Sequence, residues 1–181
     1  SKKLVNMNLI KVGPAGGKRG TVWDEKGKGE IAKFFFSYDE IAVYSLQFLF
    51  VENGNFVLSD THGPAHNNNF TTVVLDHPSE FLTSIRGFHD RGSPDTFIYL
   101  RSITFGTNKG TYGPYGMKTL VNYKLLKEFN FEIGDDRTFG GFHGTKYGGG
   151  IESIGVYVKA VTSSMIKPGQ HTRKRVKTEQ G

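Results

Sequence analysis

A turn made only of glycine runs directly into an acidic residue in segment 147–158, which reads YGGGIESIGVYV. Gly148, Gly149 and Gly150 can present bare backbone N–H groups to another molecule, because glycine has no side chain and tolerates positive φ. The carboxylate of Glu152 can accept hydrogen bonds from hydroxyl groups. This pairing of amide donors with one acid suits a sugar. The alternative is a turn that connects two strands and leaves the glutamate in solvent.

The length of 181 residues predicts one domain, large enough to fold without disulfides or metals. The chain has no cysteine, which excludes a disulfide framework, a thiolate nucleophile and a Cys-based zinc site. No apolar run approaches the roughly 20 residues that span a bilayer, and the first residues lack the apolar segment of a secretory signal. We therefore expect a cytoplasmic protein with no membrane span.

The formal net charge of +6 is concentrated at the two ends of the chain. Residues 1–12 hold three lysines, and residues 162–181 hold five cations against one acid, so the stretch between them is nearly neutral. A neutral domain is not expected to bind nucleic acid through phosphate contacts. The basic run at 173–177 is typical of a nuclear-import signal or a patch for an anionic partner, and also of a solvated, disordered tail.

Residues 13–161 read almost wholly as strands and turns, since aromatic residues and glycines recur at short intervals. Trp23 and the phenylalanines are expected to fill the core of an all-β domain. The predicted strands include Ile31–Ser37, Val43–Val51, Thr71–Leu75, Leu82–Phe88, Tyr99–Phe105, Phe129–Ile133 and Glu152–Lys159.

A short unit, serine followed by leucine or isoleucine and then by apolar alternation, recurs four times. Repetition of a hairpin-sized unit predicts a pseudo-symmetric all-β domain whose copies share one core. The four units are Ser45-Leu46, Ser84-Ile85, Ser102-Ile103 and Ser153-Ile154.

Three separated blocks resemble the jacalin-related lectins over residues 9–161. The segment GPAGGKRGTVWD at 13–24 resembles the family's glycine-rich opening strand and loop. The segment LRSITFGTNKG at 100–110, followed by YGPYG at 112–116, resembles the family's central block. The segments GFHG at 141–144 and IESIGVY at 151–157 resemble its closing hairpin. The resemblance delimits a lectin domain at 9–161, an N-terminal arm at 1–8 and a basic tail at 162–181.

The resemblance implies a β-prism of three four-stranded antiparallel sheets with pseudo-threefold symmetry. It also implies a sugar site at one end, between the glycine loop and a closing loop of pattern Gly-x-x-x-Asp. Because residues precede the glycine loop, no free amine lies there, and the resemblance points to the plant mannose/glucose-type group. Carried over by position, the carbohydrate-binding residues are Gly20, Gly148, Gly149, Gly150 and Glu152, with Tyr147 placed to pack on the sugar ring.

Two departures from the family pattern affect this site. Glu152 replaces the aspartate and is one methylene longer, which displaces the carboxylate by about one C–C bond and costs roughly a kilocalorie per mole or more. Gly149 stands where the family often has aspartate, and the loop before it is longer by one residue. The sequence therefore predicts weak or altered affinity for monosaccharides.

The other residue patterns do not indicate catalysis. His62 and His66 are four apart, but Gly63-Pro64 between them breaks any helix that would align them on a metal. Asp135 and Asp136 are neighbours, and neighbours on a strand face opposite sides. The sequence has no nucleophile elbow and no phosphate-binding loop. We expect no enzyme activity, no metal and no cofactor.

Two functions remain open. The first is a carbohydrate-binding lectin for mannose/glucose-type glycans or glycoproteins, acting in plant defence, for which a homo-oligomer would supply multivalency. The second is a protein-interaction module of plant defence, for example in restriction of pathogens, that keeps the prism and has lost the sugar site.

Overall fold

The structure is a computed structural model, and it describes residues 8–64, 69–93, 95–118, 123–161 and 163. The predicted N-terminal arm and basic tail lie outside the described residues, except for Asn8 and Ser163. Within the described part of the chain, no helix is long and apolar enough to cross a membrane.

The described fold consists of twelve strands and one short 3-10 helix, η2. Every pair of neighbouring strands is antiparallel. The elements in chain order are β1 (Leu9–Gly16), β2 (Thr21–Lys26), β3 (Ile31–Tyr38), β4 (Val43–Glu52), β5 (Asn55–Leu58), β6 (Asn69–Val74), β7 (Leu82–Asp90), β8 (Leu100–Thr107), β9 (Gly110–Gly116), η2 (Tyr123–Leu125), β10 (Leu126–Glu132), β11 (Phe139–Tyr147) and β12 (Gly150–Lys159).

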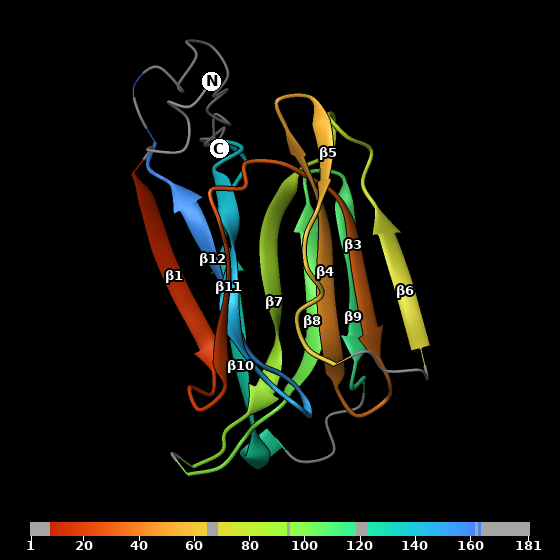
Figure 1. Ribbon diagram of the computed structural model, residues 1–181, viewed down its shortest axis with the longest axis vertical. Coiled ribbons are helices and arrows are strands. Elements are labelled where there is room, and N and C mark those ends of the chain that lie inside the picture. Colours follow the sequence, from red (N-terminus) through yellow and green to blue (C-terminus); the bar gives the residue numbers. More distant parts are fainter. Residues whose placement is uncertain (1–7, 65–68, 94, 119–122, 162, 164–181) are drawn as a thin grey trace, which may run out of the picture.

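The strands form three sheets of four, with the orders β1-β12-β11-β2, β5-β4-β3-β6 and β10-β7-β8-β9. The first of these sheets combines the two ends of the domain, because β1 pairs with β12 (Figure 1). The all-β prediction, with three four-stranded antiparallel sheets, is confirmed. The pairing of β1 with β12 also brings the glycine loop after β1 to the same end of the sheet as the hairpin before β12.

The core lies between the three sheets and is built largely from aromatic rings. Phe34 of β3 stacks on Phe105 of β8 at 4.1 Å between ring centroids, and Phe48 of β4 stacks on Phe142 of β11 at 4.4 Å. Each pair joins two different sheets, and such pairs add about 0.5–1.5 kcal/mol beyond their area of burial. Trp23 is 3% exposed, which confirms its expected place in the core.

The four serine units of the sequence all lie in central strands, two of them in the sheet of β7 and β8. The apolar residue of each unit points into the shared core. Leu46, Ile85, Ile103 and Ile154 are at most 1% exposed. The repeat therefore marks the positions where the three sheets meet.

The strands predicted from the sequence pattern do not include five strands of the structure: β1, β2, β5, β9 and β11. Strand β5 has only four residues, and β9 and β11 contain several glycines, which weaken the strand signal. These strands form because their neighbours supply partners for their backbone groups. Local preference alone does not identify them.

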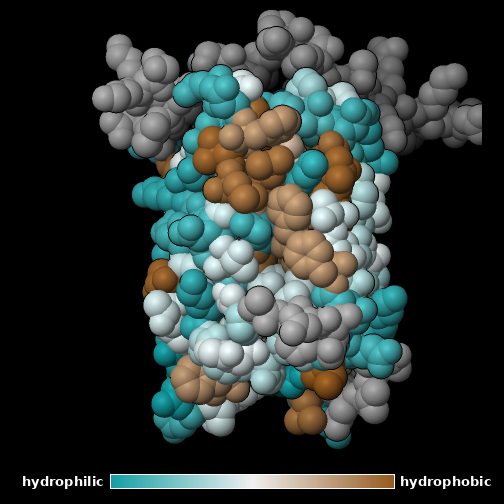
Figure 2. Space-filling view, turned by 45° about the vertical axis from the view of Figure 1, so that its right-hand side comes forward, coloured by the Kyte–Doolittle hydropathy of each residue, from teal (hydrophilic) through white to brown (hydrophobic). Residues whose placement is uncertain are grey.

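The outer face of the β5-β4-β3-β6 sheet carries an exposed apolar surface. Figure 2 brings this side of the molecule forward and shows hydrophobic side chains gathered over its upper half. Among the large exposed apolar residues are Phe56 (69% exposed), Leu58 (57%), Phe70 (65%) and Val74 (57%), all on the two edge strands β5 and β6. These exposed apolar side chains are spread over the face, because Phe56 lies opposite Val51 and Phe70 lies opposite Ser37.

Candidate functional site

The closing hairpin places Glu152 near the start of β12. Tyr147 at the end of β11 pairs with Gly150, so Gly148 and Gly149 alone form the turn. Neither of these two glycines has a positive φ, so glycine contributes to this turn by its lack of a side chain. The tight turn fixes the position of Glu152, which is the third residue of β12.

The glycine loop between β1 and β2 lies directly against this hairpin. The backbone N–H of Gly17 donates to the carbonyl of Glu152 at 3.1 Å. A Cβ atom on Gly17 would collide with the side chain of Glu152, and one on Gly20 would lie 2.8 Å from its Oε2 atom. The glycines therefore allow the loop to approach the glutamate itself closely.

The Glu152 carboxylate receives hydrogen bonds from its own protein at both oxygens. Its Oε2 accepts from the N–H of Gly20 at 2.7 Å and from the hydroxyl of Thr145 at 2.9 Å. Its Oε1 accepts from the N–H of Arg19 at 3.2 Å. Ser153 supports the arrangement, because its hydroxyl lies 2.6 Å from that of Thr145. Three donors thus hold one charged group in place.

The sequence predicted that Gly20 and Glu152 converge, and the 2.7 Å hydrogen bond confirms that they do. It also predicted a carboxylate that faces a ligand, and in the structure the Glu152 side chain is 0% exposed. Glutamate is one methylene longer than aspartate, and its carboxylate reaches the glycine loop, where it accepts from the Arg19 and Gly20 amides. Whether these residues bind carbohydrate stays a prediction.

Tyr147 does not stand free to cover a sugar ring. Its ring stacks on Phe97 with 4.6 Å between centroids and an interplanar angle of 24°, and it contacts Tyr99 at 5.8 Å. A Cβ on Gly149 would lie 2.6 Å from the Tyr147 ring, so this glycine makes room for the aromatic side chain. Burial, with a hydrogen bond and electrostatic repulsion from Tyr99, raises the pKa of the Tyr147 phenol.

The segment between β7 and β8 covers this end of the prism, which the sequence reasoning missed. Phe97 is 50% exposed and lies over Tyr147, and the guanidinium of Arg19 lies 5.3 Å from the centre of the Phe97 ring. Arg19 also donates to the carbonyl of Asp95. The two aromatic residues Phe97 and Tyr99 were the available signal, but their contact with Tyr147 depends on the packing of two sheets.

Of the predicted site residues, Tyr147 and Gly148 border a cavity of about 280 Å³. Thr21, Gly63, Pro64 and Lys146 complete its lining. Gly148 is exposed, whereas Gly150 is buried, and open space surrounds the position that a Cβ on Gly148 would occupy. The part of this end that is open to a ligand therefore lies beside the glycine turn and not at the carboxylate.

Acidic and imidazole groups do not gather into a metal site within the described ranges, where no group of three or more potential ligands occurs. His62 is buried at 5% exposure and lies 2.7 Å from a Glu25 oxygen, with its ring stacked on Trp23. His66 lies outside the described residues. The His62 side chain thus packs in the interior between β2 and β4.

Residues 12–157 match the family model described as a Jacalin-like lectin domain. The chain belongs to the jacalin-related lectin family. Members of this family bind carbohydrate and are in general not enzymes. The predicted resemblance is confirmed, and the three sheets described above are those of the jacalin-like β-prism.

Two curated relatives come from Arabidopsis thaliana. "Protein RESTRICTED TEV MOVEMENT 1" is 38% identical over 159 residues, which span 84% of this jacalin-like chain and 88% of that protein. "Jacalin-related lectin 2" is 34% identical over 180 residues, which span 94% and 95% of the two chains. Among solved structures, the artocarpin-mannotriose complex has a TM-score of 0.71 and 30% identity, covering 84% of this chain and 99% of that one.

Proposed function

We propose that this jacalin-like domain recognises a protein partner in plant defence, including restriction of pathogens, and that its own Glu152 closes the monosaccharide site. The observation that carries the proposal is the buried carboxylate, with Gly20, Arg19 and Thr145 as its donors. The Gly20 N–H, which the family resemblance assigns to a sugar, already donates to a charged acceptor. A neutral hydroxyl is a weaker acceptor than a carboxylate.

The energetics support closure. A sugar that claimed the Gly20 N–H would first have to displace the carboxylate and break its hydrogen bonds. Hydrogen bonds to a charged group contribute about 1.5–3 kcal/mol each. A cost of about 3 kcal/mol lowers affinity by more than a hundredfold. The expected consequence is negligible binding of free mannose or glucose.

Two further observations favour a protein partner. The apolar outer face of β5 and β6, with Phe56 and Phe70 well exposed, is a surface that another protein can cover. The similarity to a relative named for restricted TEV movement, 38% identical, favours a role in defence. Neither observation depends on a working sugar site.

Isothermal titration with methyl α-mannoside and methyl α-glucoside tests the proposal directly. We expect no binding at millimolar concentration by the native chain and measurable mannoside binding by Glu152→Asp, because aspartate is too short to hold the Gly20 N–H. Glu128→Gln on the exposed part of β10 is the control, and we expect it to behave like the native chain. Sub-millimolar binding by the native chain would contradict the proposal that Glu152 closes the monosaccharide site.

The second candidate is a lectin for mannose/glucose-type glycans. The open cavity beside Tyr147 and Gly148 favours it, as does the 0.71 TM-score with a lectin solved in complex with mannotriose. On this alternative, an extended glycan binds at the cavity and a homo-oligomer strengthens the contact. Retention of the native chain on immobilised mannose would support this alternative over the protein-interaction function, and free passage would support the latter.

A further inference from the structure

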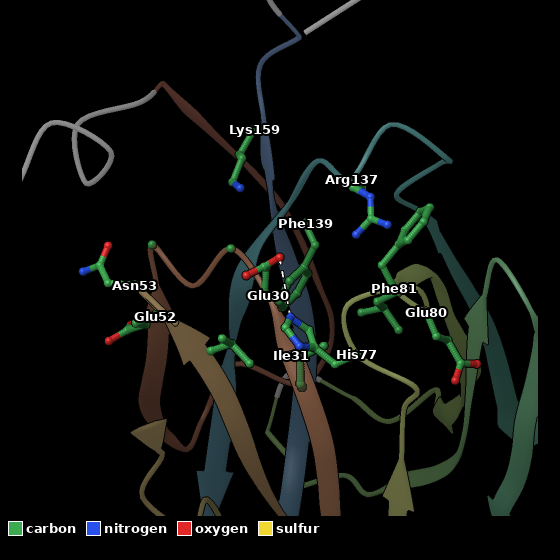
Figure 3. Close-up of a pocket in the computed structure, with 14 residues that line it drawn as sticks. Glu30, Ile31, Glu52, Asn53, His77, Glu80, Phe81, Arg137, Phe139 and Lys159 are labelled. Atoms are coloured by element: carbon green, nitrogen blue, oxygen red, sulfur yellow. Dashed lines mark ion pairs between the residues drawn. The ribbon is translucent and has the colours of Figure 1, made fainter. Parts of the chain in front are cut away.

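A second and larger cavity lies at the opposite end of the prism. Strand β12 begins at Gly150 in the candidate sugar site and ends at Lys159 in this cavity, so about 30 Å separates the two sites along the strand. The cavity has a volume of about 490 Å³, which lies within the usual range for small-molecule sites. The ends of several strands and their connecting loops surround it (Figure 3).

The floor of the cavity is apolar. Ile31, Val51, Leu82 and Phe139 line it, and each is a core residue at most 7% exposed. Phe81 adds a partly buried aromatic ring on one side. A molecule that enters the cavity therefore meets hydrocarbon and ring surface at the bottom, which favours an apolar body.

Two cations stand at the mouth. Lys159 packs over Gly29, where a Cβ would lie 2.8 Å from the ammonium nitrogen. Arg137 donates to the carbonyl of Pro78 at 3.0 Å, and its guanidinium lies 4.1 Å from the centre of the Phe81 ring. In Figure 3 the two side chains project into the space above Phe139. Among the described residues, no carboxylate lies within 4 Å of either cation.

The environment of Lys159 disfavours an uncompensated charge. Burial lowers the pKa of its ammonium, and the charge of Glu30 opposes the shift. Arg137 adopts a positive φ of 55°, an uncommon conformation for a residue with a side chain. Its contacts with Phe81 and Pro78 nevertheless fix the guanidinium, and most of its five N–H donors remain available to a ligand.

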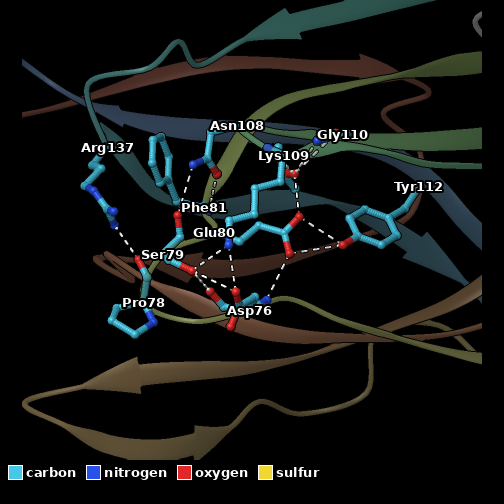
Figure 4. A network of polar contacts seen from close by, with 11 residues as sticks. Asp76, Pro78, Ser79, Glu80, Phe81, Asn108, Lys109, Gly110, Tyr112 and Arg137 are labelled. Carbon is cyan, nitrogen blue, oxygen red and sulfur yellow. Dashed lines mark hydrogen bonds and ion pairs between the residues drawn. The ribbon is translucent and has the colours of Figure 1, made fainter.

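The acids that line the cavity are mostly engaged elsewhere. Glu52 pairs with Lys28 at 2.7 Å. Glu80 is 4% exposed and belongs to a separate network, where it accepts from Thr107 and Tyr112 (Figure 4). Glu30 lies 3.6 Å from His77 and is the remaining acid of the lining. Two cations therefore face one weakly paired acid at the mouth.

We propose that this cavity binds a small amphipathic carboxylate, whose aromatic or alicyclic body rests on the apolar floor. Its carboxylate lies between the Lys159 ammonium and the Arg137 guanidinium. An apolar floor below two cations selects against neutral molecules, which leave the cations without an acceptor. It also selects against small inorganic anions, which leave the floor unfilled. The site is independent of Glu152 and of the function proposed above.

The test uses 1-naphthylacetate as the probe and its neutral amide, 1-naphthaleneacetamide, as the matched comparison. For the full chain labelled with ¹⁵N, we expect saturable shifts of the amide signals of Gly29, Phe139 and Lys159. For a ligand of this size we expect a dissociation constant of roughly a millimolar. The amide is expected to bind about tenfold more weakly, because it lacks the charge.

Variants distinguish the proposed contacts from nonspecific binding. Lys159→Gln and Arg137→Gln should each weaken binding of naphthylacetate by about tenfold or more. Lys127→Gln on the exposed part of β10 removes the same charge away from the cavity and should leave binding unchanged. Arg137 is exposed, so its variant remains informative if Lys159→Gln folds poorly. Equal binding of acid and amide, equal binding by the Arg137 variant, or the absence of saturable shifts would overturn the proposal.

Discussion

The backbone N–H of Gly20 donates a 2.7 Å hydrogen bond to Oε2 of Glu152, across 132 positions of the chain. The two residues are the ones that the family resemblance assigns to sugar binding, and here they bind each other. The Glu152 carboxylate has no exposed surface and accepts the Gly20 N–H that the family resemblance assigns to a ligand. This contact makes Glu152 a structural group of the loop, and its removal has measurable consequences.

Glu152→Gln should lower the free energy of unfolding by about 2–3 kcal/mol, because the new NH₂ group faces the N–H donors that the carboxylate now accepts from. Urea denaturation measures this as a lower midpoint with an unchanged slope. Glu128→Gln, an exposed change of the same type, should leave the midpoint unaltered. Equal midpoints for the two variants would mean that the buried contacts contribute nothing.

Gly20→Ala should destabilise the fold by about 1–3 kcal/mol, because a Cβ at this position collides with the carbonyl of Lys146 and crowds the Glu152 carboxylate. Gly148→Ala is the matched control in the facing loop. Open space surrounds its Cβ position, so the change should be within about 0.5 kcal/mol. Thermal unfolding of both variants compares them, and a stable Gly20→Ala protein would place the loop further from Glu152 than described.

Acid should remove part of the stability through Glu80. Burial raises the pKa of this carboxyl, but hydrogen bonds from Thr107, the Asp76 N–H and Tyr112, together with the charge of Lys109, outweigh it and leave the pKa below its ordinary value of 4.5. A lowered pKa stabilises the fold above pH 4.5, and this contribution is lost as pH falls through the folded-state value.

Urea midpoints measured from pH 7 downward in the native chain and in Glu80→Gln check this expectation. The native midpoint should fall more steeply with acid than that of the variant, whose residue 80 does not titrate. Parallel curves would assign the acid sensitivity to other carboxylates.

Alkali should weaken the contact between Tyr157 and Asp24, whose hydroxyl and carboxylate oxygens lie 2.7 Å apart. Burial, the hydrogen bond to Asp24 and the charge of that acid raise the pKa of the Tyr157 phenol to about 12. A raised pKa stabilises the fold fully below the ordinary value of 10.0, and this contribution is lost as pH rises through about 12.

Tyr157→Phe removes this titration. The difference in unfolding free energy between the native chain and the variant should therefore shrink between pH 10 and 12. Denaturant unfolding at several alkaline pH values measures the difference. A difference in unfolding free energy that stays constant over this interval would show that the pKa of the Tyr157 phenol is not raised in the folded protein.

The sequence by itself determined the architecture. The alternation around Leu46, Ile85, Ile103 and Ile154 marks central strands, because buried strands need an apolar residue on the core face at every copy of the repeat. The three blocks that resemble jacalin-related lectins also located the two loops of the candidate site. These features are local in the chain, so they can be identified without knowledge of what packs against them.

Only the tertiary structure decided the state of the site. At the start of β12, the alternation of apolar and polar residues does not show which side chains are buried. All four residues there are 0% exposed: Ile151, Glu152, Ser153 and Ile154. Whether the acid faces a ligand or the protein depends on which donors reach it, and these come from Arg19 and Gly20 at the far end of the sequence and from Thr145 on the neighbouring strand. The cavity at Lys159 likewise exists only because strand ends from all three sheets meet there. The sequence gives the type and length of each side chain, but the groups that surround the side chain depend on how strands distant in the sequence pack together.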